Sequence, residues 1–299
     1  MGTGTRIYLS DTKFNNSALP QGDPFSIDGV IRNGFAGGFR PAESLSKTSD
    51  LSGRVGTAFS QGAPAFDNKS LIGSANSGVL TTIEETRDIT MIVTCRALQN
   101  DNGVWGTGNS YYANACSTYA DTRGADAAGG PRGIGPLLFS TKNSSTNLME
   151  LCVASEFSFY NKAAGEYGQT NLRSTFAVSD DDTLAGLSQD AAPWIWCSTV
   201  VSGNSFKVTS PTIGWADSRS YTEAQDFEIH NRLLAAKDTG VPNRVPIGTS
   251  MANFTWLGLN GRIAVAEVLI FNRGLSDDEI KIQYELSKAW LSTNRGIMV

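Results

Sequence analysis

The sequence has no excess of basic residues and no long hydrophobic run. Its 24 Lys and Arg residues are outnumbered by 29 Asp and Glu residues, so the formal net charge at pH 7 is −5. Proteins that grip the phosphate backbone need a basic surface, and we therefore expect no nucleic-acid partner. No stretch of about 18 apolar residues occurs, which argues against insertion of a helix into a membrane.

Cysteine and histidine are also scarce, with four cysteines and one histidine. No two cysteines have the spacing of a zinc or redox pair. Cys95 and Cys197 lie inside apolar, strand-like runs, and we expect both to be buried, reduced thiols. The first residues, MGTGTRIYLSDTKF, lack the apolar core of a signal peptide, so we expect synthesis and folding in a cytoplasm.

The 299 residues are 40% hydrophobic and include 31 glycines, which fits a globular chain with many turns. Short runs rich in Ile, Val, Thr and aromatic residues alternate with clusters of turn-forming residues, a rhythm typical of antiparallel β structure. The predicted strands are RIYL near Arg6, SGVLTTI near Val79, ITMIVTCRAL from Ile89, PLLFST from Pro136, NLMELCVA from Asn147, WIWCSTVV from Trp194, FKVTSPTI from Phe206 and RIAVAEVLIFN from Arg262.

The last predicted strand is apolar on both faces. Strict alternation places Ala264, Ala266, Val268 and Ile270 on one face and Ile263, Val265, Leu269 and Phe271 on the other. A strand with one wet face would alternate apolar with polar residues, so we expect this strand to be central and covered on both sides. Glu267 interrupts the run, and its carboxylate needs hydrogen-bond donors if it is buried.

A helix is predicted to follow directly. Ser276 and Glu279 have the spacing of a capping box, so the helix should begin near Asp277. It carries two apolar stripes, one with Ile280, Tyr284 and Leu291 and the other with Ile282, Leu286 and Ala289 beside Trp290. Either the N-terminal segment or a loop covers the second stripe, or the stripe makes a subunit contact.

Residues 1–49 differ from the rest of the chain in composition: they contain Pro, Gly and Asn but few periodic apolar positions. We interpret them as an N-terminal arm or docking segment, and residues 50–299 as one domain. Residues 119–135 predict a long surface loop.

The end of the chain resembles the closing strand and terminal helix of the concanavalin A-like lectin/glucanase superfamily, in its laminin-G-like or pentraxin-like branch. The residues that carry the resemblance are Gly261, Glu267, Asn272, Arg273, Leu275, Ser276 and Glu279. DLSGRVGTAFSQGAPAF from Asp50, PWIWCSTVVSG from Pro193 and VPIGTS from Val245 resemble earlier parts of the same domain. The resemblance implies an all-β fold: a jelly-roll β-sandwich of two curved antiparallel sheets, with a short C-terminal helix.

The start, TRIYLSDTKFNNSAL, resembles the N-termini of proteins encoded in the structural-gene regions of tailed bacteriophages and prophages. This resemblance implies a virion protein that is assembled in the bacterial host cytoplasm, with other virion proteins as partners, and we expect a homo-oligomer.

Residue patterns for hydrolysis are incomplete. Glycoside hydrolases of the resembled superfamily carry a Glu-x-Asp-x-x-Glu strand motif, since retaining hydrolysis needs two close carboxylates. Asp226 and Glu228 approach this motif but lack the third carboxylate, and Glu150 and Glu156 lack the intervening Asp. The sequence has no Gly-x-Ser-x-Gly motif that would supply a nucleophile for His230. We therefore expect no catalytic residues and no enzyme activity.

Calcium is the usual metal of the resembled superfamily and takes six to eight oxygen ligands. Two oxygen-rich turns contain the candidate ligands, which are Asp101, Asn102, Asp180 and Asp182. Neither turn matches an EF-hand loop, and solvated turns have the same composition.

Sugar binding requires aromatic faces flanked by amide and carboxylate hydrogen bonders, on loops that the sandwich holds in place. The first candidate set is Trp105, Tyr111, Tyr112 and Asn114, and the second is Trp215, Asp217 and Arg219, next to Tyr221. Each of these aromatic residues would serve equally well as packing under a loop, whereas Trp194 and Trp196 lie in a predicted core strand.

Three functions remain open at this point. The first is a non-enzymatic virion protein, of the tail or receptor-binding type, that recognises a cell-surface glycan. The second is a head-decoration or baseplate component that uses the sandwich for protein docking, and the third is a glycoside hydrolase. Fold alone does not choose among them.

Overall fold

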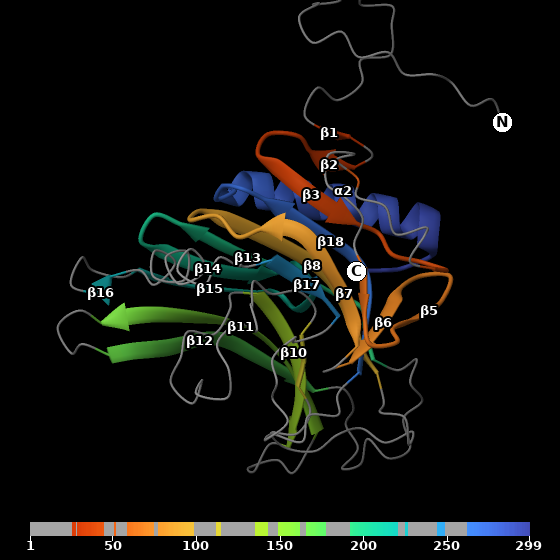
Figure 1. Ribbon diagram of the computed structural model, residues 1–299, viewed down its shortest axis with the longest axis horizontal. Helices are drawn as coiled ribbons and strands as arrows, with labels where there is room; N and C mark the ends of the chain where they lie inside the picture. Colours follow the sequence, from red (N-terminus) through yellow and green to blue (C-terminus); the bar gives the residue numbers. More distant parts are fainter. Residues whose placement is uncertain are drawn as a thin grey trace, which may run out of the picture.

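The computed structural model describes residues 26–27, 29–44, 51, 59–74, 77–98, 112–114, 135–142, 149–161, 166–177, 192–220, 225–226, 244–248 and 262–299. These residues form layers of antiparallel β-strands, with one long helix across the outer side of the largest sheet (Figure 1). The predicted all-β sandwich with a C-terminal helix is confirmed. No helix among the described residues has the length and apolar character needed to cross a membrane.

The largest sheet has eight strands. Seven of them follow one path, in the order β15 (Trp215–Ser220), β14 (Ser205–Ser210), β13 (Ile195–Ser202), β8 (Ile89–Leu98), β18 (Arg262–Phe271), β6 (Leu71–Ser74) and β5 (Ala65–Phe66). The eighth, β3 (Phe35–Phe39), pairs with the second half of β18, beyond the part that pairs with β6.

The opposite layer consists of two smaller sheets. One contains β12 (Glu166–Ala177), β11 (Met149–Asn161), β10 (Gly135–Lys142) and β9 (Tyr112–Asn114), with β16 (Gln225–Asp226) paired to β11. The other contains β17 (Arg244–Ile247), β7 (Gly78–Glu84) and β4 (Phe59–Gln61). A separate hairpin, β1 (Ser26–Ile27) with β2 (Val30–Ile31), lies beside the helix (Figure 1).

An apolar cluster fills the space between the layers, and we call it the inner core. Its members include Met91, Val93, Cys197, Phe206, Val208 and Val265 of the large sheet and Val79, Leu172 and Val245 of the opposite layer. Because strands of both layers share one cluster, the sheets form a single sandwich.

A second cluster, which we call the outer core, lies between the large sheet and the helix. Its members include Ile92, Trp196, Leu269 and Phe271 of the sheet, Ile31 and Phe35 of the N-terminal segment, and Ile280 of the helix. The central strands β8 and β18 are therefore buried on both faces, as the continuous apolar run of the last strand predicted.

A β-bulge changes the face alternation predicted for β18. The register with β8 shifts between Val265 and Glu267, so Ala266 has no paired residue of its own. As a result Val265 and Val268 both face the inner core, whereas Leu269 faces the outer core. The predicted face assignment is thus wrong beyond the bulge, because one extra residue inverts the alternation that follows it.

The bulge also directs Glu267 toward the helix side, where Arg40 supplies the donors that the sequence required. Arg40 Nε donates to Glu267 Oε1 over 2.8 Å, and both side chains are almost fully buried. The Arg40 guanidinium lies 3.8 Å from the centroid of the Trp290 ring on the helix. Removal of Arg40 would leave the Glu267 carboxylate buried without its charged partner, which costs about 3–5 kcal/mol.

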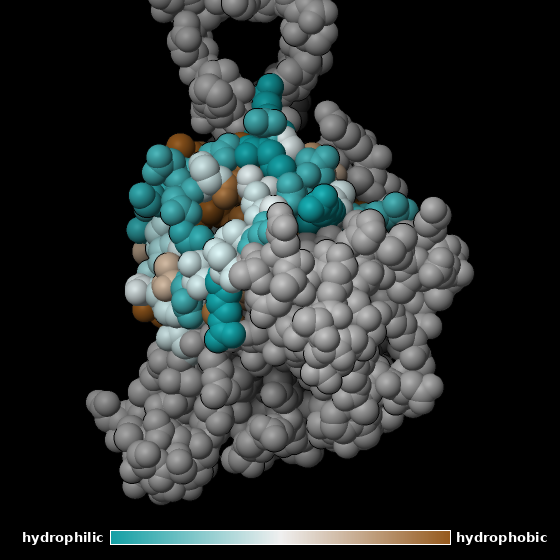
Figure 2. Space-filling model, turned by 90° about the vertical axis from the view of Figure 1, so that its left-hand side faces the viewer, coloured by the Kyte–Doolittle hydropathy of each residue, from teal (hydrophilic) through white to brown (hydrophobic). Residues whose placement is uncertain are grey.

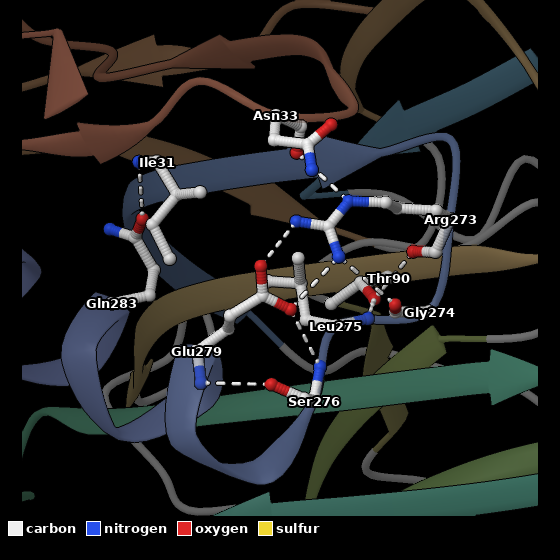
Figure 3. Close-up of polar contacts among 9 residues, drawn as sticks. All are labelled: Ile31, Asn33, Thr90, Arg273, Gly274, Leu275, Ser276, Glu279 and Gln283. Atoms are coloured by element: carbon white, nitrogen blue, oxygen red, sulfur yellow. Dashed lines mark hydrogen bonds and ion pairs between the residues drawn. The ribbon is translucent and has the colours of Figure 1, made fainter. Parts of the chain in front are cut away.

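Helix α2 (Asp277–Arg295) begins as predicted. The Ser276 hydroxyl accepts from the Glu279 backbone N–H, and the Ser276 N–H donates to the Glu279 carboxylate, which completes the capping box. Figure 3 shows the Arg273 guanidinium facing the same carboxylate, with contacts of 2.9 and 2.5 Å. Arg273 Nε also donates to the Asn33 carbonyl, so one side chain joins the strand end, the helix start and the N-terminal segment.

Thr90 connects the same corner to the centre of the sheet. Its hydroxyl donates to the Arg273 carbonyl over 2.8 Å and accepts from the Leu275 N–H over 2.9 Å (Figure 3). The motif that carries the family resemblance therefore holds a strand–helix corner together.

The N-terminal segment partly covers the second apolar stripe of α2. The backbone of Gly29 approaches Leu286 and Trp290, and Gln283 accepts from the Ile31 N–H over 3.0 Å. Ile282 stays 52% exposed. β3 lies before residue 50 but belongs to the large sheet. The division of the chain into an arm of residues 1–49 and a domain of residues 50–299 stays a prediction.

Cys95 and Cys197 are buried free thiols in the inner core, as predicted. Burial raises the pKa of Cys95 to about 12 and raises that of Cys197 well above its ordinary value. Protonated, buried thiols of this kind are structural residues.

Candidate functional site

The structure brings Trp215, Asp217 and Arg219 together on β15, at the edge of the large sheet. Tyr112 and Asn114 are the two ends of β9, where their backbones pair with Phe139 and Leu137 of β10. The other predicted sugar-binding residues, Trp105 and Tyr111, and the neighbouring Tyr221 lie outside the described residues.

The turn that leads into β15 departs from the predicted strand. FKVTSPTI was expected to be extended throughout, but β14 ends at Ser210, and Pro211–Ile213 form the 3-10 helix η6. Pro211 favours this turn because its φ is fixed and it lacks an N–H for the sheet ladder. Gly214 then reverses the chain with a φ of 64°, a conformation that side chains disfavour.

Ser210 and Thr212 hold this turn against β13, and the sequence did not predict that role. The Ser210 hydroxyl donates to the Trp196 carbonyl over 2.8 Å, and the Trp196 N–H donates to the Thr212 hydroxyl over 3.0 Å. These bonds fix the start of β15 against β13. A Ser-Pro-Thr sequence is a turn signal, and the apolar residues around it obscured that signal.

The face on which the three site residues lie follows from the register. Asp217 is opposite Val208 and Arg219 is opposite Phe206, and directly opposed residues share a face. Phe206 and Val208 belong to the inner core. The apolar inner face of β14 therefore continues into a polar row on β15.

Trp215 differs from its two companions in burial. It is half-buried and packs against the inner core, whereas Asp217 and Arg219 are exposed. The Asp217 carboxylate accepts from the neighbouring Ser218 N–H over 2.7 Å. Residues two apart on a strand are spaced by about 6.6 Å, so an aromatic ring, a carboxylate and a guanidinium follow one another along one face.

Such a row offers complementary contacts to a polyhydroxylated ligand. The carboxylate accepts hydrogen bonds and the guanidinium donates them, while a tryptophan ring offers an apolar surface with a fixed orientation. β12 of the opposite layer is the strand that approaches β15 across the sandwich. Asp217 and Arg219 are nevertheless exposed at this edge of the large sheet.

One end of the sandwich has a mainly polar surface where it is described. Figure 2 shows the end of the sandwich that lies on the left in Figure 1, and hydrophilic residues cover most of its described surface. Hydrophobic residues form small patches between them. This composition suits a polar ligand better than a large apolar partner.

The proposed calcium ligands Asp101, Asn102, Asp180 and Asp182 all lie outside the described residues. Within the described part of the chain, no group of three or more acidic, histidine or cysteine side chains is placed to hold a metal ion. The calcium prediction is therefore untested.

The carboxylates considered for hydrolysis are only partly placed. Glu150 and Glu156 lie on β11, opposite Thr141 and Gly135 of β10. Asp226 pairs through its backbone with Tyr160, and Glu228 and His230 lie outside the described residues.

No protein-family model matches this sequence, and no curated protein matches it. The structure is similar to solved binding domains of several toxins. It matches the binding domain of Botulinum neurotoxin serotype D with 10% identity and a TM-score of 0.47, over 87% of this chain and 51% of that chain. It matches the binding domain of Paraclostridial Mosquitocidal Protein 1 with 12% identity and a TM-score of 0.47, over 86% and 52%.

A third similar structure is the binding domain of Botulinum neurotoxin DC in complex with rat synaptotagmin II, with 11% identity and a TM-score of 0.48, over 85% of this chain and 52% of that chain. The chain thus spans about half the length of these structures, and at such scores the likeness carries no inference about function. Because no family model matches, the concanavalin A-like resemblance seen in the sequence stays a prediction.

Proposed function

We propose that this chain is a non-enzymatic adhesion protein that binds a cell-surface glycan at the edge strand β15. The observation that carries the proposal is the row of Trp215, Asp217 and Arg219 on one face of that strand. The inner core fixes the tryptophan from below, and the two charged side chains are open to solvent.

A purely structural role is the rival explanation of the same row. Edge strands commonly carry charged, inward-pointing residues because these residues discourage pairing with a strand of another protein. Asp217 and Arg219 on the inner face of β15 fit that description as well. The half-buried Trp215 at the end of the row favours a ligand, because protection of an edge does not require an aromatic surface.

The setting that we propose is the virion of a tailed bacteriophage, in which the chain forms a homo-oligomer and contacts other virion proteins. Support comes from the N-terminal segment from Thr5 to Leu19, which resembles phage structural proteins. Mass spectrometry of purified virions and labelling of intact particles with gold-conjugated antibodies test this placement. Detection in free cytoplasm but not in particles would contradict it.

Glycan binding is tested on an array of bacterial envelope glycans with the full chain. Trp215→Ala, Asp217→Asn and Arg219→Gln should each weaken binding at least about tenfold, because each removes a contact worth about 1.4 kcal/mol or more. Ser218→Ala is the matched control, since Ser218 lies on the same strand but faces the other way. Equal binding by all four variants would reject β15 as the site and direct attention to Trp105 and Tyr112.

A chelator separates this site from a calcium-dependent one. We expect glycan binding at β15 to persist in EDTA, because no metal-binding group of side chains occurs among the described residues. Loss of binding in EDTA with recovery on adding Ca²⁺ would instead implicate the turns that contain Asp101 and Asp182.

Release of reducing sugar tests the remaining alternative. We expect no release from a glycan that the chain binds. Release by the wild type that disappears in Glu228→Gln would show that the protein is a glycoside hydrolase.

A further inference from the structure

Three polar side chains occupy adjacent positions across the centre of the large sheet. Thr94 of β8 is paired with Glu267 of β18 on one side and with Trp196 of β13 on the other. All three face the helix side of the sheet, as do their neighbours Ile92 and Leu269 in the outer core. Directly paired residues have Cβ atoms about 4.5–5.5 Å apart, so the three side chains share one small region.

Each of these side chains is completely buried and has one polar atom without a hydrogen-bond partner. The atoms are the Thr94 hydroxyl oxygen, the Trp196 indole nitrogen and Oε2 of Glu267. Arg40 donates to Oε1 of the same carboxylate, which leaves the second oxygen directed elsewhere. Buried polar atoms are nearly always bonded to protein or to internal water, so three such atoms at neighbouring positions point to a shared ligand.

The chemistry of the three groups defines what that ligand must do. Glu267 Oε2 only accepts hydrogen bonds, the Trp196 indole only donates, and the Thr94 hydroxyl does both. A metal cation cannot accept from the indole N–H, and an anion is repelled by the carboxylate. A small neutral molecule that both donates and accepts meets the requirement.

We propose that Glu267, Thr94 and Trp196 form the binding site of an ordered internal water molecule. The water donates to Glu267 Oε2, accepts from the Trp196 indole and shares its third hydrogen bond with Thr94. Three partners is the usual number for a buried water. The site is independent of the glycan row on β15.

Helix α2 closes the region from above. Its buried face carries Gln283 and Ser287, which are bonded to each other over 3.2 Å, and Gln283 is also fixed by the Gly29 carbonyl and the Ile31 N–H. Tyr284 packs edge-on against Trp196, with ring centroids 5.4 Å apart. Because the helix is held over the sheet at these points, the water exchanges with bulk solvent only when α2 opens.

A crystal structure of the full chain, at a resolution that shows ordered solvent, tests the proposal directly. We expect electron density for one water within 2.7–3.2 Å of Glu267 Oε2 and of at least one of the other two atoms. Direct bonds from the Trp196 indole to Thr94 and from Thr94 to Glu267, with no density between them, would overturn it.

A solution experiment provides the second test. In the wild type labelled with ¹⁵N-tryptophan, the indole proton of Trp196, assigned with Trp196→Phe, should show a cross-peak to long-lived water. Thr94→Val keeps the shape of the side chain and removes only the hydroxyl, so the cross-peak should persist if the indole contacts the water itself. The absence of any cross-peak between the Trp196 indole proton and long-lived water in the wild type would reject the site.

Glu267→Gln changes the carboxylate that accepts from the water, and the same Trp196 cross-peak is measured in this variant. Trp194→Phe is the matched control, because Trp194 belongs to a different cluster. The control should leave the Trp196 cross-peak unchanged. If Glu267→Gln fails to fold, the wild-type spectrum still decides the question.

Discussion

Arg273 and Glu279 stabilise the start of α2 by charge as well as by capping. Hydrogen bonds from Arg273 are the main reason that the pKa of Glu279 falls from 4.5 to about 2. Because the folded-state pKa lies below the unfolded-state value, the contribution to stability is complete above about pH 4.5 and is lost as the pH falls toward 2.

Glu279→Gln should therefore lower the free energy of unfolding by about 1–2 kcal/mol at pH 7, since it removes a bidentate ion pair and weakens a cap. The difference from the wild type should shrink as the pH approaches 2. Urea unfolding at pH 7 and pH 3 measures both values. Asp278→Asn is the control, because the contact of Asp278 with Lys281 is exposed and 3.4 Å long, and it should change the stability by less than about 0.5 kcal/mol.

The buried thiols lead to a second prediction at the scale of single residues. Since burial raises the pKa of Cys95 to about 12, neither Cys95 nor Cys197 should react with iodoacetamide at pH 8 in the native protein. Both should react fully in denaturant, and peptide mapping by mass spectrometry measures the extent at each site. Equal modification in the native and denatured states would show that this part of the inner core is open to solvent.

At the scale of the elements, two glycines bring β6 and the end of β17 into close contact. A Cβ on Gly73 of β6 would lie 2.0 Å from the carbonyl oxygen of Gly248, directly after β17. This contact joins the large sheet to the three-stranded sheet, and backbone atoms cannot yield as a side chain would. The spacing of the two layers at this point therefore depends on the absence of a side chain.

Gly73→Ala should lower the free energy of unfolding by at least about 2 kcal/mol, because the added methyl group separates two sheets. Gly214→Ala is the comparison: nothing lies within 4 Å of its Cβ position, so only its φ of 64° opposes the change. We expect a loss of about 1–2 kcal/mol there. Thermal unfolding of both variants tests the distinction, and a Gly73→Ala variant as stable as the wild type would contradict the tight contact.

At the scale of the whole molecule, stability should decrease from the central strands toward the sheet edge. β8 and β18 are covered on one side by the inner core and on the other by the outer core, whereas nearly all of β15 is exposed. The slowest-exchanging amides of a protein lie in elements that open only with the whole fold.

Hydrogen–deuterium exchange should therefore show the strongest protection in peptides from β8, β13 and β18, and much faster exchange in β15. Mass spectrometry of the full chain, with time points from seconds to hours, measures this order. Bound glycan should slow exchange in β15 alone. Protection of free β15 equal to that of β8 would indicate that another surface covers this edge.

The sequence by itself determined the features that depend on neighbouring residues. The apolar runs from Ile89 and Arg262 predicted the two central strands, and the spacing of Ser276 and Glu279 predicted the first turn of α2. Hydrophobic periodicity and helix capping depend on residues close together in the chain, so both can be recognised from the sequence. The sequence also indicated Trp215, Asp217 and Arg219 as candidate sugar-binding residues, but it did not predict the strand on which they alternate.

Tertiary structure alone decided which partner each of these elements meets. The bulge at Ala266 inverts the faces of the last strand, and Arg40, distant in sequence, neutralises Glu267. The edge position of β15, which leaves its polar row open, also results from the pairing of distant strands. No local pattern encodes such contacts, because their free energy arises only when segments far apart in the chain are packed together.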